Sequence, residues 1–381
     1  MSNDGAAFAT PAAARPQSAL TEMLQLSWVQ PPGFTALSFK NFGLAVVTLG
    51  IYKFWGKTEV RKRIWSGIRI NGEPLQYTGT GKEMFLGFLL VLAILTIPTF
   101  LVAIVVAVVF GNSPVANGIV NAVLYGGFLY LIGVGMHRAV RYRLSRTIWR
   151  GIRGGLEGSS WRYGWAYFWT GIVLVVTLGW ASPWRATKLQ NLITNDMRFG
   201  NRPFHFDATS GPLYGPFAAL WLSVVAIAMA VSLSMWLVLR GMPGGLEAFG
   251  PGRNPDPKTL FTLFAILYGG VILGFLLFAV VSAWYRAQMM NHFAAHTSFE
   301  EAKFHGSATG RSLIWLALSN TLMVIFTLGL LAPVAQARSA RYFVERLRLD
   351  GSASLAEILQ RAEDSRSRGE GLAQAFDIDA F

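Results

Sequence analysis

Cysteine is absent from the chain, which excludes disulfide bonds, thiol chemistry and cysteine-ligated metals. Charge is also scarce, because Asp, Glu, Lys and Arg make up only 14% of the residues, against roughly 25% in soluble domains. Histidine occurs only five times in 381 residues, which leaves little for general-base catalysis. Apolar residues instead reach 53% of the chain, and this composition indicates an integral membrane protein.

Four segments contain no Asp, Glu, Lys, Arg or His and are long enough to cross a bilayer, which takes about 20 helical residues. The uncharged linker Gly111–Pro114 joins the first pair and the Gly/Pro-rich stretch Arg240–Lys258 joins the second, so each pair is expected to be a helical hairpin. The absence of ionisable groups from these segments disfavours a proton-coupled carrier. The four predicted spans are Met84–Phe110, Val115–Met136, Leu213–Leu239 and Leu260–Trp284.

The formal net charge of +13 comes from Lys and Arg that lie in loops beside apolar segments. The positive-inside bias explains this distribution, and no nucleic-acid partner is expected. Residues 56–83 hold 6 such cations, residues 137–162 hold 7, and residues 335–381 hold 7. We therefore expect these loops and the C-terminus on the cytoplasmic side of a bacterial inner membrane.

The tripeptide Thr-Leu-Gly occurs three times, starting at Thr48, Thr177 and Thr327. Each copy belongs to an apolar segment that either spans the membrane or re-enters it. The re-entrant arrangement gives equivalent loops equivalent surroundings, because all the basic loops then share one side. Each motif is expected to mark where its segment reaches the cytoplasmic face and continues into a basic helix and a β-hairpin. The three segments are Ala36–Trp55, Tyr163–Trp184 and Ser312–Val334.

Turn-forming pairs follow the three motifs at a constant distance. Asn-Gly and Asp-Gly supply the positive φ angles of a tight hairpin turn. Alternating residues flank them, so the sequence predicts several cytoplasmic β-hairpins that pair into a small sheet or barrel. The predicted turns are Asn71-Gly72, Gly200-Asn201 and Asp350-Gly351.

The pattern of the first copy is similar to a known family. Residues 48–55 read Thr-Leu-Gly-Ile-Tyr-Lys-Phe-Trp, a basic stretch follows, and residues 72–79 read Gly-Glu-Pro-Leu-Gln-Tyr-Thr-Gly. This resembles the YjgN-like family of multi-pass bacterial inner-membrane proteins, a domain of unknown function, over roughly residues 24–381. The resemblance implies a membrane fold and brings no reaction, cofactor or catalytic residue. The later copies depart from the aromatic run, as at Trp180–Pro183.

Two groups of residues are candidates for binding. His292 and His296 lie four apart and would share one helix face, which makes them weak candidates for a metal site. A surface for lipid headgroups or a partner protein is expected at cations of the basic stretches, since such helices lie in the membrane interface. These cations are Lys57, Arg61, Lys62, Arg63, Arg141, Arg143, Arg338 and Arg341.

These observations divide the chain into a disordered tail (1–22), a first repeat unit (23–162), a second (163–311), a partial third (312–351) and an acidic amphipathic tail (352–381). The fold class is an integral membrane protein, mainly α-helical. We expect a non-enzymatic scaffold that contacts anionic lipid or a membrane protein partner. The sequence leaves open whether the chain forms a homo-oligomer. A channel or transporter for a small solute is the alternative, and a membrane-embedded lipid-modifying enzyme is a third hypothesis.

Overall fold

The computed structural model describes residues 22–111, 113–241 and 256–353. Within these ranges the chain is mainly helical, and four helices are long and apolar enough to cross a membrane. This confirms the prediction of four such helices. They are α3 (Gly81–Phe110), α4 (Pro114–Ser145), α7 (Tyr214–Gly241) and α8 (Pro257–Ala295), with the short 3-10 helix η2 (Gly211–Leu213) before α7.

The long helices form two pairs whose ends are fixed by side chains. Thr80 and Glu83 cap the start of α3, each bonding the other's backbone N–H. Glu83 also accepts a hydrogen bond from Tyr142 (2.7 Å) and pairs with Arg146 (2.8 Å), both near the end of α4. The hairpin of α3 and α4 is therefore closed at its base, where the chain enters and leaves.

The second pair is held by close helix approach. A Cβ on Gly270 of α8 would lie 2.6 Å from Val231 Cγ2 of α7, and one on Gly274 would lie 2.8 Å from Ile227 Cγ2. Small residues at this spacing let two membrane helices approach closely. The Gly-x-x-x-Gly sequence of α8 thus packs within the chain.

The remaining helices form three shorter pairs: α1 (Phe34–Val47) with α2 (Lys53–Gly67), α5 (Ser160–Val176) with α6 (Ser182–Thr194), and α9 (Gly310–Phe326) with α10 (Ala332–Arg346). The first helix of each pair has 14 or 17 residues. At 1.5 Å per residue it reaches roughly 21–26 Å, less than the ~30 Å of bilayer hydrocarbon.

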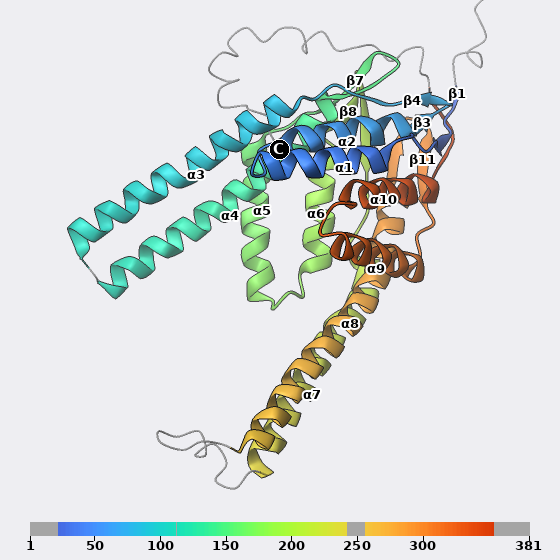
Figure 1. Ribbon diagram of the computed structural model, residues 1–381. Coiled ribbons are helices and arrows are strands. Elements are labelled where there is room, and N and C mark those ends of the chain that lie inside the picture. The colour runs from blue at the N-terminus through green and yellow to red at the C-terminus, as the bar shows by residue number, and fades with distance from the viewer. Residues whose placement is uncertain (1–21, 112, 242–255, 354–381) are drawn as a thin grey trace, which may run out of the picture.

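The structure places the Thr-Leu-Gly motif inside each short helix pair. We expected each motif to mark where its segment reaches the cytoplasmic face and continues into a basic helix and a β-hairpin. Thr48, Thr177 and Thr327 stand at helix C-caps between the two helices of a short pair. The strands follow only after the second helix, so the motif lies at the end of the pair away from them. Figure 1 shows this for α5 and α6, whose connecting turn points away from the strands.

Short antiparallel strands form a ring. An eight-stranded sheet runs in the order β12-β11-β10-β9-β8-β7-β6-β5, and smaller sheets pair β2-β3-β4 and β1-β13. Only one or two residues separate β1 from β2, β4 from β5 and β12 from β13, so the three sheets join into a closed barrel. The strands are β1 (Glu22–Met23), β2 (Leu26–Trp28), β3 (Ile68–Ile70), β4 (Glu73–Pro74), β5 (Gln76–Tyr77), β6 (Thr147–Trp149), β7 (Ile152–Leu156), β8 (Met197–Phe199), β9 (Arg202–Phe206), β10 (Thr297–Phe299), β11 (Ala302–Gly306), β12 (Leu347–Asp350) and β13 (Ser352–Ala353).

Side chains from every part of this ring fill the barrel. Trp149, Phe299 and Ala302 are at most 5% exposed and lie in one apolar cluster with Leu24. Alternation places one residue in two on the inner face of a strand. Further members of the cluster come from the other strands: Ile70, Leu75, Ile152, Phe199, Phe204, Phe304 and Leu349.

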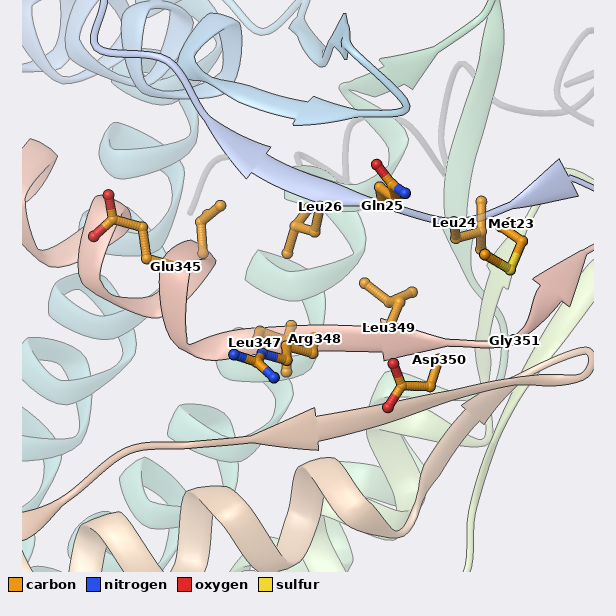
Figure 2. Close-up of a pocket in the computed structure, with 11 residues that line it drawn as sticks. Met23, Leu24, Gln25, Leu26, Glu345, Leu347, Arg348, Leu349, Asp350 and Gly351 are labelled. Carbon is orange, nitrogen blue, oxygen red and sulfur yellow. The ribbon is translucent and has the colours of Figure 1, made fainter.

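The barrel closes where the first and last strands meet. β1 pairs with β13, and the backbone N–H of Leu24 donates to the carbonyl of Gly351 (3.4 Å). Beyond this bond β2 and β12 diverge and leave a groove of about 590 Å³, with Leu26 on one side and Leu349 on the other (Figure 2). The groove is therefore an opened seam in the barrel wall.

One predicted turn has a different role at this seam. Asp350-Gly351 does not connect two strands that pair with each other, because β12 pairs with β11 and β13 pairs with β1. Gly351 is a bend at which the strand changes partner. Its φ of 127° suits glycine, and a Cβ there would lie 2.6 Å from the Glu301 carbonyl oxygen. The pairs Asn71-Gly72 and Gly200-Asn201 do lie between paired strands, β3 with β4 and β8 with β9.

The helix pairs all leave the barrel and return to it at a neighbouring strand. Among the described residues, α1–α2 connects β2 to β3, α3–α4 connects β5 to β6, α5–α6 connects β7 to β8, α7–α8 connects β9 to β10, and α9–α10 connects β11 to β12. Short and long pairs alternate along the chain (Figure 1). Because neighbouring strands here are antiparallel, each pair starts and ends at the same rim of the barrel.

The two predicted tails lie almost wholly outside the described residues. Of residues 1–22, Glu22 belongs to β1, and of residues 352–381, Ser352 and Ala353 form β13.

Candidate membrane-contact surface

The three Thr-Leu-Gly turns share one backbone geometry. The leucine has φ of 50° at Leu49, 48° at Leu178 and 49° at Leu328, and the glycine after it has φ of 86° to 91°. A left-handed backbone costs a residue with a Cβ about 1–2 kcal/mol. Three leucines that bear this cost at equivalent places indicate that an apolar side chain is needed at the turn.

The threonine bonds the backbone on both sides of the turn. Thr177 Oγ1 donates to the Val173 carbonyl (2.8 Å) and accepts the N–H of Ala181 (3.1 Å). Thr48 and Thr327 make the same two bonds, four residues before and four after. The glycine N–H closes the helix end, as Gly179 does by donating to Leu174 (2.8 Å). These polar groups therefore need no water.

The outer surface of each turn is apolar and unusually exposed. Leu49, Leu178 and Leu328 are 94%, 79% and 86% exposed. Valine and phenylalanine just before the motif are exposed to a similar degree, at Val47, Val176 and Phe326. We call these three turns with their flanking apolar residues the apolar tips.

The apolar tips have the properties of segments that enter hydrocarbon. A bilayer requires backbone groups to be paired within the protein, and it accepts apolar side chains without cost. In water, three such clusters would be unfavourable exposed patches. The tips also cannot cross, because the first helix of each pair is too short for the hydrocarbon. Each short pair therefore suits insertion into one leaflet.

The first short pair carries lysine on both of its helices, and Lys53 lies closer to its turn than Arg185 does in the second pair. Lys40 of α1 pairs with Glu59 of α2 (2.9 Å), and the hydrogen bond that Lys40 donates to the Glu59 carboxylate raises the pKa of Lys40. Lys53 and Lys57 are exposed on α2 close to the turn. Lysine at such a position reaches toward headgroups through its flexible stem, so this pair suits a shallower position than α5–α6.

Half of the predicted basic surface holds the protein itself together. Arg63 donates to the Pro32 carbonyl (2.8 Å), and Arg141 donates to the Leu156 carbonyl (3.1 Å). Arg338 bonds Ser319 (3.1 Å), and Arg341 pairs with Glu345 (2.7 Å). Arg63, Arg141 and Arg338 each bind another segment of the chain and Arg341 pairs within α10, so all four guanidinium groups have partners in the protein.

The other four cations are less engaged. Lys57 and Lys62 are exposed on α2, and Arg143 is exposed near the end of α4. Arg61 donates to the Tyr77 hydroxyl (3.3 Å) and lies over its ring. Arg61 and Lys62 lie in the half of α2 that leads to β3, and Arg143 lies near the end of α4, so these three cations lie toward the barrel, at the level expected for headgroups, whereas Lys57 lies closer to the turn.

The predicted metal candidates have other partners. His292 Nε2 lies 2.8 Å from the Thr209 carbonyl, and His296 Nδ1 lies 2.8 Å from the His292 carbonyl. Neighbouring carboxylates are engaged as well, since Glu300 pairs with Arg202. The described parts of the chain contain no group of three or more His, Asp or Glu side chains placed to hold a metal ion.

Sequence reasoning missed the leucines of the motif and the arginines stacked on aromatic rings. Arg138 lies 5.4 Å from the centre of the Trp161 ring in the first turn of α5, and Arg185 lies 4.3 Å from the centre of the Tyr167 ring in the middle of α5. The signal for the leucines was in the chain, because an identical leucine precedes a glycine at all three turns. We had interpreted the motif as a boundary and not as a contact surface.

Comparison with known proteins gives a family and one curated relative. Residues 33–375 match the family model described as a bacterial protein of unknown function (DUF898). The chain is 20% identical over 357 residues to the inner membrane protein YjgN of Salmonella typhimurium, which covers 84% of this chain and 86% of the relative. No solved structure matches.

Proposed function

The chain belongs to the DUF898 family of bacterial proteins, and we propose that it is a non-enzymatic scaffold anchored in the bacterial inner membrane. In this proposal the barrel lies on the cytoplasmic side, the two long helix pairs cross the bilayer, and the three short pairs insert their apolar tips into the near leaflet. The name of the Salmonella relative supports the choice of membrane. The described helices α3, α4, α7 and α8 supply the spans.

One observation carries the proposal: every helix pair begins and ends at the same rim of the barrel. If the long pairs cross the bilayer twice, the barrel stays on one side, and short pairs from the same rim must enter and return. This favours the re-entrant arrangement of the Thr-Leu-Gly segments. The alternation of short and long pairs also supports the repeat units that the sequence predicted.

The cytoplasmic side follows from charge. Lys and Arg next to membrane segments favour the cytoplasm. The barrel side of the long pairs carries the cations of α2, the end of α4 and α10, whereas the linker of the first pair, Gly111–Pro114, carries none. The tail that follows β13 leaves from the barrel side, which supports a cytoplasmic C-terminus.

The packed interior of the barrel favours a scaffold function over a channel function. Trp149, Phe299 and their neighbours pack together in one apolar cluster of the barrel, which favours a filled interior over a solute path. The long pairs expose most of their apolar surface, as at Phe261 (74%) and Phe275 (69%). Such surfaces suit lipid, a second copy of the chain or another membrane protein.

Lipid contact is the part of this function that can be measured directly. In nanodiscs, the double variant Lys57→Gln with Lys62→Gln should bind spin-labelled phosphatidylglycerol more weakly than the unaltered protein. Each lysine near an anionic surface contributes about 1 kcal/mol, so loss of both should cost about 2 kcal/mol and lower the affinity roughly 30-fold. Binding of spin-labelled phosphatidylcholine should not change.

A matched variant controls for net charge. Arg240→Gln with Lys258→Gln removes the same charge at the opposite end of α7 and α8, where both side chains are exposed. It should leave the phosphatidylglycerol preference intact. If the two double variants lost equal affinity for phosphatidylglycerol, Lys57 and Lys62 would have no special contact with headgroups.

A further inference from the structure

A cleft separates α8 from the first turns of α9 on the barrel side of the second long pair. Its volume is about 920 Å³, and most of its walls are apolar. Val280 and Trp284 line it from α8, and Ile314 and Trp315 line it from α9. Because α8 is one of the helices that can cross the membrane, lipid would have access to this cleft.

The cleft narrows to a base where α9 begins. A Cβ on Gly310 would lie 2.9 Å from Trp284 Cα, so the two backbones nearly touch there. The hydroxyls of Thr309 and Ser312 bond each other's backbone N–H and cap the helix. Arg311 is exposed at the same level and lines the cleft. Its guanidinium has no ion pair with any described carboxylate, so it can bind an anion.

The equivalent junction of the first long pair has no such space. A Cβ on Gly164 of α5 would lie 2.4 Å from Val134 Cγ2, and one on Gly133 of α4 would lie 2.5 Å from Tyr167 Cβ. If the N-caps Ser159 and Thr309 are placed in register, Ile314 occupies the position of Gly164. A branched side chain in place of glycine holds the second pair of helices apart and opens the cleft.

We propose that this cleft binds one anionic phospholipid, with an acyl chain between α8 and α9 and the phosphate at Arg311. Two exposed tryptophans line the cleft, Trp284 and Trp315, and this residue type is suited to the boundary between hydrocarbon and headgroups. Basic pockets between membrane helices on the cytoplasmic side bind anionic headgroups. The inference rests on the proposed position of α8 in the bilayer and adds a defined lipid site to it.

Photocrosslinking tests the site in the full-length protein. In nanodiscs that contain phosphatidylglycerol with a photoactivatable acyl chain, label should concentrate on α8 and α9 peptides around Trp284 and Ile314. Arg311→Gln should lower that label about fivefold. Val280→Trp, which fills the cleft and keeps the arginine, should lower it as well.

Arg162→Gln is the matched control, because Arg162 is exposed in the first turn of α5 at the closed junction. It should leave the label on α8 and α9 unchanged. Equal label in Arg311→Gln and Arg162→Gln, or equal label from the phosphatidylcholine analogue, would overturn the site. The Lys57 and Lys62 variant reports separately on the proposed headgroup contact of α2, so failure of that contact leaves the label at the cleft unchanged.

Discussion

Phe299→Ala should lower the free energy of unfolding by about 3–5 kcal/mol, as expected when a large aromatic side chain is removed from a closed core. Phe299 is 5% exposed and belongs to the cluster that fills the barrel. Its ring lies 4.8 Å from that of Phe204 and 6.2 Å from that of Phe199. The loss should extend to the whole barrel, because every strand depends on the same interior.

Denaturant titration in detergent, followed by near-ultraviolet circular dichroism, measures this effect. Phe39→Ala is the control, since the Phe39 side chain is 59% exposed on α1 and outside the barrel. The control should unfold at nearly the unaltered midpoint. If Phe299→Ala unfolded at the same denaturant midpoint as Phe39→Ala, the barrel interior would not stabilise the protein.

Leu178→Asp should withdraw the α5–α6 pair from the membrane. A carboxylate at the centre of a membrane helix costs about 2.5–3.5 kcal/mol on insertion scales, enough to change the inserted fraction by roughly a hundredfold. The native leucine is 79% exposed to its surroundings, so the side chain at this position meets hydrocarbon directly if the apolar tips are inserted.

The depth of this tip can be read from one fluorophore. The chain has no cysteine, so Val176→Cys provides a unique attachment site beside the tip. Lipids with brominated acyl chains should quench the attached dye strongly, and Leu178→Asp should abolish that quenching. Thr209→Cys, exposed near the barrel, should not be quenched in either background. Strong quenching by aqueous iodide at residue 176 of the otherwise unaltered chain would contradict insertion.

The sequence predicted the spanning helices well because the bilayer imposes a simple rule on them. Long segments without charge must pair their backbone internally, and hydropathy detects this directly. The predicted ends were less accurate: α4 continues nine residues past Met136 to Ser145. There α4 packs near α5 with polar residues such as His137, which bonds Ser160.

The barrel was harder to predict because its order is set by contacts between distant residues. Local signals located turns at Asn71-Gly72 and Gly200-Asn201, since such turns need positive φ. Strands of two to five residues carry too little alternation to fix their partners. The closure of β1 on β13 joins residues 22 and 353, and no local pattern indicates it.

Prediction from the sequence was limited in a similar way for the basic surface. Arg63 and Arg141 have the same sequence character as Lys57 and Lys62, and the sequence grouped all four together. Only the structure shows that Arg63 and Arg141 donate to carbonyls of loops that lie 31 and 15 residues away. Whether an arginine is free for a headgroup depends on those acceptors, which sequence proximity does not reveal.

The barrel and the bases of all the helix pairs are expected to lie on one side of the membrane. Single cysteines at Gln76 of β5 and His205 of β9, both exposed, test this arrangement with a membrane-impermeant maleimide in oriented vesicles. Asn117, exposed near the start of α4, serves as the far-side reference. Gln76→Cys and His205→Cys should react from the cytoplasmic side and Asn117→Cys from the other. Reaction of the Gln76 and His205 positions from opposite sides would contradict this arrangement.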